Sequence, residues 1–265
     1  MAYDKKSFIL GLATGLATRG VLRNPAKEEQ QEGAYLTFSS PGWFILNTVT
    51  ISAGSNQPTW NGTIEYSTDA KAWSVWSGRS GIVSKMTEGT HFLYLRGKNN
   101  TILNSKSEWH WSITSNTDVS CFGNIESLLD YEIFSLGQHP TMQGFCCQSL
   151  FSGCDKLVRP PSLSTANISA GCYWTMFQNT GIKFIPKLPS EVLQPYCYYN
   201  MLSGCTGIKL STTRVGEYQT AYRIPSSGTG TTATNALNNM FTNTGGTFTG
   251  TPSINTTYYT SNEVV

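Results

Sequence analysis

The second half of the chain repeats a short cysteine-containing motif, and internal repetition restricts the possible folds more than any other feature of a sequence. The clearest copies are CQSLFSGCDKL from Cys147, CYWTMFQNTGI from Cys172 and CYYNMLSGCTGI from Cys197. Each copy contains a pair of large apolar residues, and a fourth pair follows: Leu150 and Phe151, Met176 and Phe177, Met201 and Leu202, and Met240 and Phe241. The steps between successive pairs are 26, 25 and 39 residues.

A repeat of this length lies within the range of leucine-rich repeats. One unit cannot bury its apolar face alone, whereas stacked neighbours form a continuous core. We therefore expect residues 141–265 to form a short leucine-rich-repeat solenoid with a C-terminal cap. The long last step places an insertion in the Gly-, Ser- and Thr-rich stretch 226–234.

Within a unit, apolar residues recur at positions i, i+4 and i+8, as in Cys197, Met201 and Cys205. This spacing predicts one buried face of a short helix. Two- or three-residue strands such as 182–184 and 208–210 are expected to follow. The predicted repeat core comprises Cys146, Leu150, Phe151, Cys154, Cys172, Met176, Phe177, Cys197, Met201, Leu202, Cys205, Met240 and Phe241.

The seven cysteines are read as structural thiols. Stacked helices lie about 8–10 Å apart, beyond the roughly 7 Å limit on the Cα separation of a disulfide. Most of the repeat cysteines are therefore expected to be reduced and buried. No Cys-x2-Cys pair is present to begin a metal site, so no metal is predicted.

Residues 31–120 show the two-residue alternation of β-strands. Expected strands are 35–38, 44–46, 63–67, 73–76, 92–96 and 109–113, with a last strand within 119–124. Trp109, Trp111 and Ile113 are expected on one face. Short strands at this spacing predict an antiparallel β-sandwich, and residues 121–140 read as a junction with one or two helical turns. The fold class is therefore α+β, mainly β.

Residues 1–30 are expected to form a separate segment and linker. Phe8, Ile9, Leu10, Leu12 and Leu16 alternate with small residues that allow close packing against another backbone. Apolar residues at a free terminus favour a partner, so the segment is interpreted as a docking peptide. A signal peptide and a frayed terminus are the alternatives.

The composition of the chain and the motifs it lacks narrow the range of functions to be expected. Charged residues make up 13% of the chain and the formal net charge is +2, without a basic run. This distribution argues against nucleic-acid binding. No apolar stretch is long enough for a membrane span. The sequence has no triad, paired-carboxylate or phosphate-loop signal, so neither an enzyme nor a cofactor is predicted.

Aromatic residues are the candidate contacts for a carbohydrate or protein partner. The candidates for surface binding are Trp174, Tyr198 and Tyr199 in the repeats, and Trp60, Trp73 and Trp76 in the β-rich part. The alternative is that some of these rings fill the core.

The repeat resembles the BspA-like leucine-rich repeats of bacterial surface proteins and gut bacteriophage proteins, whose unit reads C-Y-x-x-M-F-x-G-C-T-S-L. Residues 197–208 match it closely, and residues 241–265 resemble the end of such arrays. Residues 1–20 are similar to N-terminal segments of gut-phage virion proteins, and residues 63–74 resemble a β-domain that precedes the repeats in phage proteins. The third turn, 210–214, departs from the usual proline-rich form.

The resemblance implies a tail, baseplate or head-fibre protein of a virion assembled in the host cytoplasm. Its N-terminal segment would bind other virion proteins, and its array would bind a host-surface glycan or protein. Weak sites gain from multiplicity, so a homo-oligomer such as a trimer is expected. The alternatives are a purely structural virion protein and a bacterial cell-surface adhesin.

Overall fold

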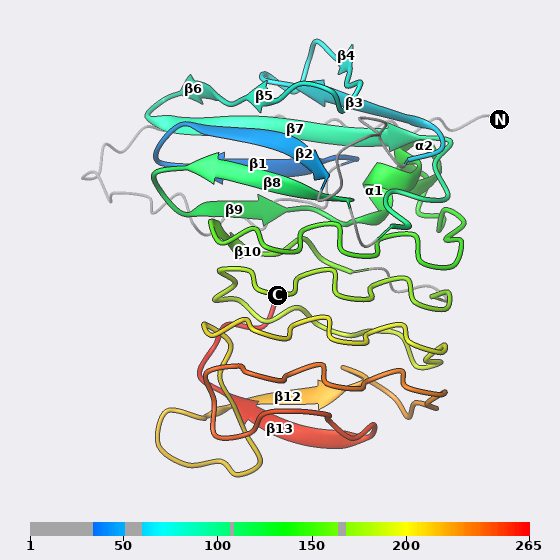
Figure 1. Cartoon of the computed structure of the whole chain (residues 1–265), viewed down its shortest axis with the longest axis vertical. Helices are drawn as coiled ribbons and strands as arrows, with labels where there is room; N and C mark the ends of the chain where they lie inside the picture. The colour runs from blue at the N-terminus through cyan, green and yellow to red at the C-terminus, as the bar shows by residue number, and fades with distance from the viewer. Residues whose placement is uncertain (1–33, 51–59, 107–108, 164–167) are drawn as a thin grey trace, which may run out of the picture. The chain divides into compact units, whose positions relative to one another are not determined.

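The computed structural model describes residues 34–50, 60–106, 109–163 and 168–265 (Figure 1). These residues belong to one compact unit, Glu32–Val265. Strands make up 31% of the structure and helices 4%, which confirms the predicted mainly β class. The predicted docking residues Phe8, Ile9, Leu10, Leu12 and Leu16 lie outside the described residues, so that function stays a prediction.

The strands form three sheets (Figure 1). The largest sheet has the order β10-β9-β1-β7-β3-β4, with β6 also paired to β7. Its strands are β1 (Leu36–Ser40), β3 (Thr63–Ser67), β4 (Ser74–Val75), β6 (Lys85–Thr87), β7 (Thr90–Lys98), β9 (Val119–Phe122) and β10 (Leu157–Arg159). The second sheet consists of β5 (Ile82–Val83), β2 (Phe44–Thr50) and β8 (Trp109–Ser115). The third consists of β11 (Leu210–Ser211), β13 (Thr256–Thr260) and β12 (Thr220–Ile224).

Alternation of side chains explains the strands of the first two sheets. In β8, Trp109, Trp111 and Ile113 are buried together, which confirms the predicted face. In β7, Leu93 and Leu95 point inward. Most buried hydrophobic residues of both sheets belong to one hydrophobic cluster, which continues into the second half of the chain. All the predicted strands of this part are present, whereas the short strands β5 and β6 were not predicted.

The helices predicted for the repeated motif are wrong. The four copies, residues 145–154, 171–180, 196–205 and 235–244, are runs of consecutive turns, here called the turn segments. Every fourth residue has a positive φ, which an α-helix does not allow. These residues are Phe145, Ser149, Gly153, Gly171, Thr175, Asn179, Tyr196, Asn200, Gly204, Asn235, Asn239 and Asn243. The predicted strand at 182–184 is also absent.

The positive-φ residues make successive backbone N–H groups alternate in direction. One N–H donates to the carbonyl three residues earlier, as from Leu150 to Cys147 (3.2 Å). The next donates to the following turn segment, as from Phe151 to Met176 (2.9 Å). The same register joins the second segment to the third and the third to the fourth. Backbones paired in this way lie about 4.8 Å apart.

This spacing overturns the distance argument used for the cysteines. Helices would have separated the units by about 8–10 Å, whereas backbone pairing brings them within the Cα separation of a disulfide. All seven cysteines are nevertheless free and buried.

The first turn segment continues from the β-rich part through hydrogen bonds of the same kind. The carbonyl of Cys146 accepts from the N–H groups of Leu103 (2.7 Å) and Asn104 (2.8 Å), and the carbonyl of Leu150 accepts from Trp111 (2.7 Å). Between them, the carbonyl of Gln148 accepts from the side-chain amide of Asn104 (2.6 Å). The division into 31–120, 121–140 and 141–265 stays a prediction, and the buried cluster runs across it.

The fourth turn segment ends against the C-terminal part of the chain. Its Asn239 N–H donates to the Thr251 hydroxyl (2.8 Å), and its Phe241 N–H donates to the Gly250 carbonyl (2.8 Å). Two of the N–H groups that would otherwise donate to a fifth copy of the motif are thereby satisfied.

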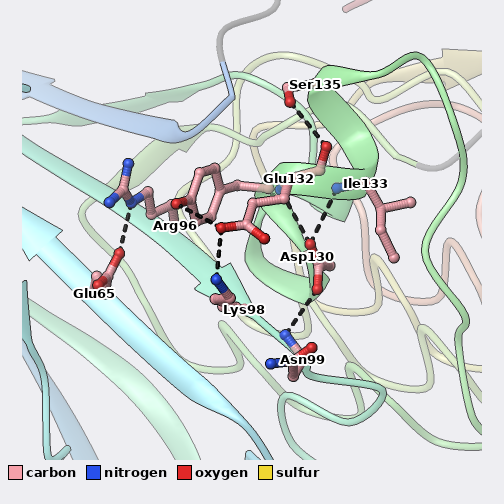
Figure 2. Close-up of polar contacts among 9 residues, drawn as sticks. Glu65, Arg96, Lys98, Asn99, Asp130, Glu132, Ile133 and Ser135 are labelled. Atoms are coloured by element: carbon pink, nitrogen blue, oxygen red, sulfur yellow. Dashed lines mark hydrogen bonds and ion pairs between the residues drawn. The ribbon is translucent and has the colours of Figure 1, made fainter.

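Two short helices, α1 (Glu126–Leu129) and α2 (Tyr131–Ser135), form the expected helical turns of the junction. Figure 2 shows how Asp130 caps α2: its Oδ1 accepts from the N–H groups of Glu132 (3.0 Å) and Ile133 (3.1 Å). Its Oδ2 accepts from the N–H of Asn99 (2.9 Å), just after β7. Lys98 of β7 forms an ion pair with Glu132 (2.6 Å). These contacts fix α2 to the end of β7.

Candidate functional site

Side chains at matching positions of the turn segments stack in columns inside the structure. The rings of Phe151 and Phe177 are parallel with centroids 5.8 Å apart, and those of Tyr173 and Tyr198 are 5.7 Å apart. All thirteen residues predicted for the repeat core are buried. The interior is therefore made of aligned residues, and function must be sought on the outward positions.

Two predicted surface residues are in fact part of the core. Tyr198 is 0% exposed because its position points inward, where its ring stacks on Tyr173. Trp76 is 3% exposed, and its indole N–H donates to the carbonyl of Ser80 (2.8 Å). The prediction that these two side chains lie on the surface is wrong.

Trp60 and Trp73 have other neighbours. The partly buried Trp60 packs on Trp76 with centroids 5.3 Å apart. Half-buried Trp73 lies under the guanidinium of Arg96, 4.1 Å from its ring centroid, and that guanidinium also lies 4.0 Å from the ring centroid of Tyr131. Arg96 further pairs with Glu65 (2.7 Å; Figure 2). The guanidinium of Arg96 thus covers one face of Trp73. Because Arg96 belongs to β7 and Tyr131 to α2, this cluster joins α2 to the sheet.

Trp174 and Tyr199 meet on the outside of the turn segments. Together with Phe145 and Tyr196 they form a cluster that we call the aromatic surface. The ring centroid of Trp174 lies 5.1 Å from that of Tyr199, 5.4 Å from Tyr196 and 5.8 Å from Phe145. The three rings of Trp174, Tyr196 and Tyr199 are half-buried, and Phe145 is 37% exposed.

The turn geometry explains why these rings gather. Trp174 and Tyr199 occupy matching positions in neighbouring turn segments, directly after inward-pointing tyrosines. Phe145 and Tyr196 share another matching position, at which the intervening segment has Gly171. A Cβ on Gly171 would collide with the ring of Phe145. The glycine therefore lets Phe145 reach across to Trp174.

Phe145 and Tyr196 were not among the predicted site residues. The sequence does indicate these two residues in one way. In the aligned copies, each lies three residues before a position whose side chain faces the surface. None of the four rings of the aromatic surface carries a formal charge. Such a surface suits the apolar face of a sugar or an apolar side chain of a protein.

The thiols offer no reactive group to this surface. Burial raises the pKa of the Cys154 and Cys197 thiols to about 12 and that of Cys205 to about 11. Burial also raises the pKa of the Cys121, Cys147 and Cys172 thiols. Since a thiolate is the reactive form of cysteine, these residues are structural.

We expect these thiols to make stability fall in alkaline solution. Their ordinary pKa of 9.0 is raised in the folded state, so between 9.0 and about 12 the folded protein binds more protons than the unfolded chain. The stabilisation is complete below pH 9.0 and is lost as the pH rises through this range. Urea midpoints measured across it should fall, and should fall less steeply in Cys154→Ala. Equal slopes for the two proteins would contradict this assignment.

Among the described residues, no helix has the length and apolar character needed to cross a membrane. Within the same residues, no three His, Cys, Asp or Glu side chains come together as a set of metal ligands. Comparison of the chain with models of known protein families, with curated proteins and with solved structures returned no match.

Proposed function

We propose that residues 141–265 are a short leucine-rich-type repeat array, and that residues 31–120 are an antiparallel β-sandwich capping its first unit. The support for the array is that three successive junctions between turn segments have hydrogen bonds in one register. The support for the cap is that Leu103, Asn104 and Trp111 donate to the first segment as a preceding unit would.

We propose that the chain is a non-enzymatic virion protein of a bacteriophage and acts as a fibre- or tail-type adhesin. Residues 1–30 dock it into the particle, and several copies act together. The array presents the aromatic surface to a glycan of the host surface. The observation that supports the binding role is the set of four partly exposed rings with centroids 5.1–5.8 Å apart. Natural interfaces draw much of their affinity from such aromatic anchors.

Loss of the central ring tests the binding function. In the full chain, we expect Trp174→Ala to weaken binding to immobilised bacterial surface polysaccharides at least about tenfold, equivalent to about 1.4 kcal/mol. The reason is that Trp174 contacts all three other rings. Binding constants from surface plasmon resonance would measure the change.

The matched control is Trp43→Ala, which removes another partly exposed tryptophan, 45% exposed, that precedes β2. It should bind as the unchanged protein does. Equal losses in both variants, or no binding of the unchanged protein to any polysaccharide, would reject the aromatic surface as the site. Absence of the chain from purified phage particles would reject the virion assignment.

A further inference from the structure

A cavity of about 480 Å³ lies where α2 and its following loop meet the second half of the chain. Its lining includes Asn124, Glu126, Phe134, His139, Ser162 and Lys187. None of these residues belongs to the aromatic surface. Ligand sites in proteins have volumes of about 300–1,000 Å³, so this cavity suits a small molecule.

Glu126 and His139 form a fixed polar pair in this cavity. Glu126 is the first residue of α1, and its side chain is 0% exposed. Both of its carboxylate oxygens lie within hydrogen-bonding distance of Nδ1 of His139, at 3.0 and 3.1 Å. These two contacts orient the imidazole of His139 with Nδ1 toward Glu126. The side chain of His139 is 47% exposed and forms part of the cavity lining.

The helical wall of the cavity is anchored to the neighbouring strand β7. Phe134 lies in α2, whose first turn is capped by Asp130 and whose Glu132 pairs with Lys98 (Figure 2). The opposite anchor is Asn124, whose Oδ1 accepts from the N–H of Glu126 (2.9 Å). A site whose walls are fixed before binding loses less entropy when a ligand arrives.

The chemistry of the lining selects the class of ligand. The carboxylate of Glu126 and the ammonium of Lys187 carry opposite charges, so the cavity does not favour a strongly charged molecule. The hydroxyl of Ser162 and the imidazole of His139 offer hydrogen bonds, while Phe134 offers an apolar ring. A pyranose has hydroxyls around its edge and an apolar C–H face. We infer that this cavity binds a neutral monosaccharide unit through the ring of Phe134 and the hydrogen-bonding groups beside it.

Free monosaccharides provide the direct test with the full chain. Saturation-transfer NMR would be recorded with glucose, galactose, mannose and N-acetylglucosamine, and with glucosamine and glucose 6-phosphate as charged comparators. We expect at least one neutral sugar to bind with a Kd of about 1–10 mM. Failure of all four neutral sugars, or tighter binding of either charged sugar, would overturn the inference.

Two substitutions locate the binding to this cavity. Phe134→Ala removes the ring, and His139→Asn keeps an amide donor near Glu126 while removing the imidazole. Each is expected to weaken the neutral sugar at least about fivefold, a loss of about 1 kcal/mol, with an unchanged melting temperature for His139→Asn. Trp43→Ala, which changes neither the cavity nor the aromatic surface, should leave monosaccharide binding intact. If His139→Asn folds and binds the sugar normally, the assignment is wrong, whatever the polysaccharide result.

Discussion

Replacing Leu202 with alanine is expected to lower the free energy of unfolding by about 2–5 kcal/mol. Leu202 is 0% exposed and belongs to the third turn segment. Its position matches those of Phe151, Phe177 and Phe241 in the neighbouring segments. Backbone hydrogen bonds fix the spacing on both sides, so the surrounding structure cannot collapse fully into the space left behind. Chemical denaturation of the full chain, followed by circular dichroism, would measure the loss.

The same substitution at Leu136 is the control. Leu136 is 74% exposed at the end of α2, and its truncation should change stability by no more than about 0.5 kcal/mol. Comparable stability of the two variants would mean that the column of large residues at this position does not form the core described above.

Gly97→Ala is the second substitution with a large expected effect. A Cβ at this position of β7 would overlap the backbone carbonyl oxygen of Leu128 in α1. Neither backbone can move easily, because β7 pairs with β1 and β3 while α1 is fully buried. We expect a loss of about 3 kcal/mol or more, at the upper end for overpacked sites. The thermal midpoint and the urea midpoint would both report it.

Gly144→Ala separates this steric effect from the general effect of removing a glycine. A Cβ on Gly144 would meet only the carbonyl oxygen of Ala170, at an ordinary 3.5 Å. This variant should be as stable as the unchanged protein or slightly more stable, because alanine restricts the unfolded chain. A Gly97→Ala protein of normal stability would show that α1 does not press on β7 as described.

The strands were predictable because a half-buried strand leaves a two-residue signature. The expected strand 63–67 coincides with β3, and the expected face of β8 is the buried one. The short strands β5 and β6 escaped prediction because two or three residues are too few to show an alternation. β5 is defined by its pairing with β2, which is distant in the sequence, and β6 by a hairpin with β7, which follows it directly.

The turn segments were predicted as helices because a spacing of four residues does not distinguish a helix from a four-residue turn that recurs. The distinguishing signal lay between the apolar positions. Asn179, Asn200, Asn239 and Asn243 occupy positive-φ positions, and asparagine adopts that conformation more readily than most residues. A regular series of asparagine and glycine at this spacing therefore indicates turns and argues against a helix.

The candidate site was predictable only in part. Trp174 and Tyr199 lie outward, whereas the adjacent Tyr198 lies inward, and this difference depends on the alternating backbone of the turn segments. The cavity beside His139 could not be predicted, since its lining brings together residues from 124 to 265 through the fold. Nothing in the local sequence indicates that Glu126 and His139 meet.

The direction of the hydrogen bonds has a consequence for how such proteins can vary. Backbone N–H groups of each turn segment donate to carbonyls of the following one. The series is completed by Asn104, which donates to the first segment, and by Gly250 and Thr251, which accept from the fourth. These end groups belong to other parts of the chain. Inserting one more segment would leave both end groups unchanged. The stack of turn segments could then lengthen by about 4.8 Å for each added segment. Each added segment would bring two positions whose side chains face the surface, and an aromatic residue could be acquired or lost at each.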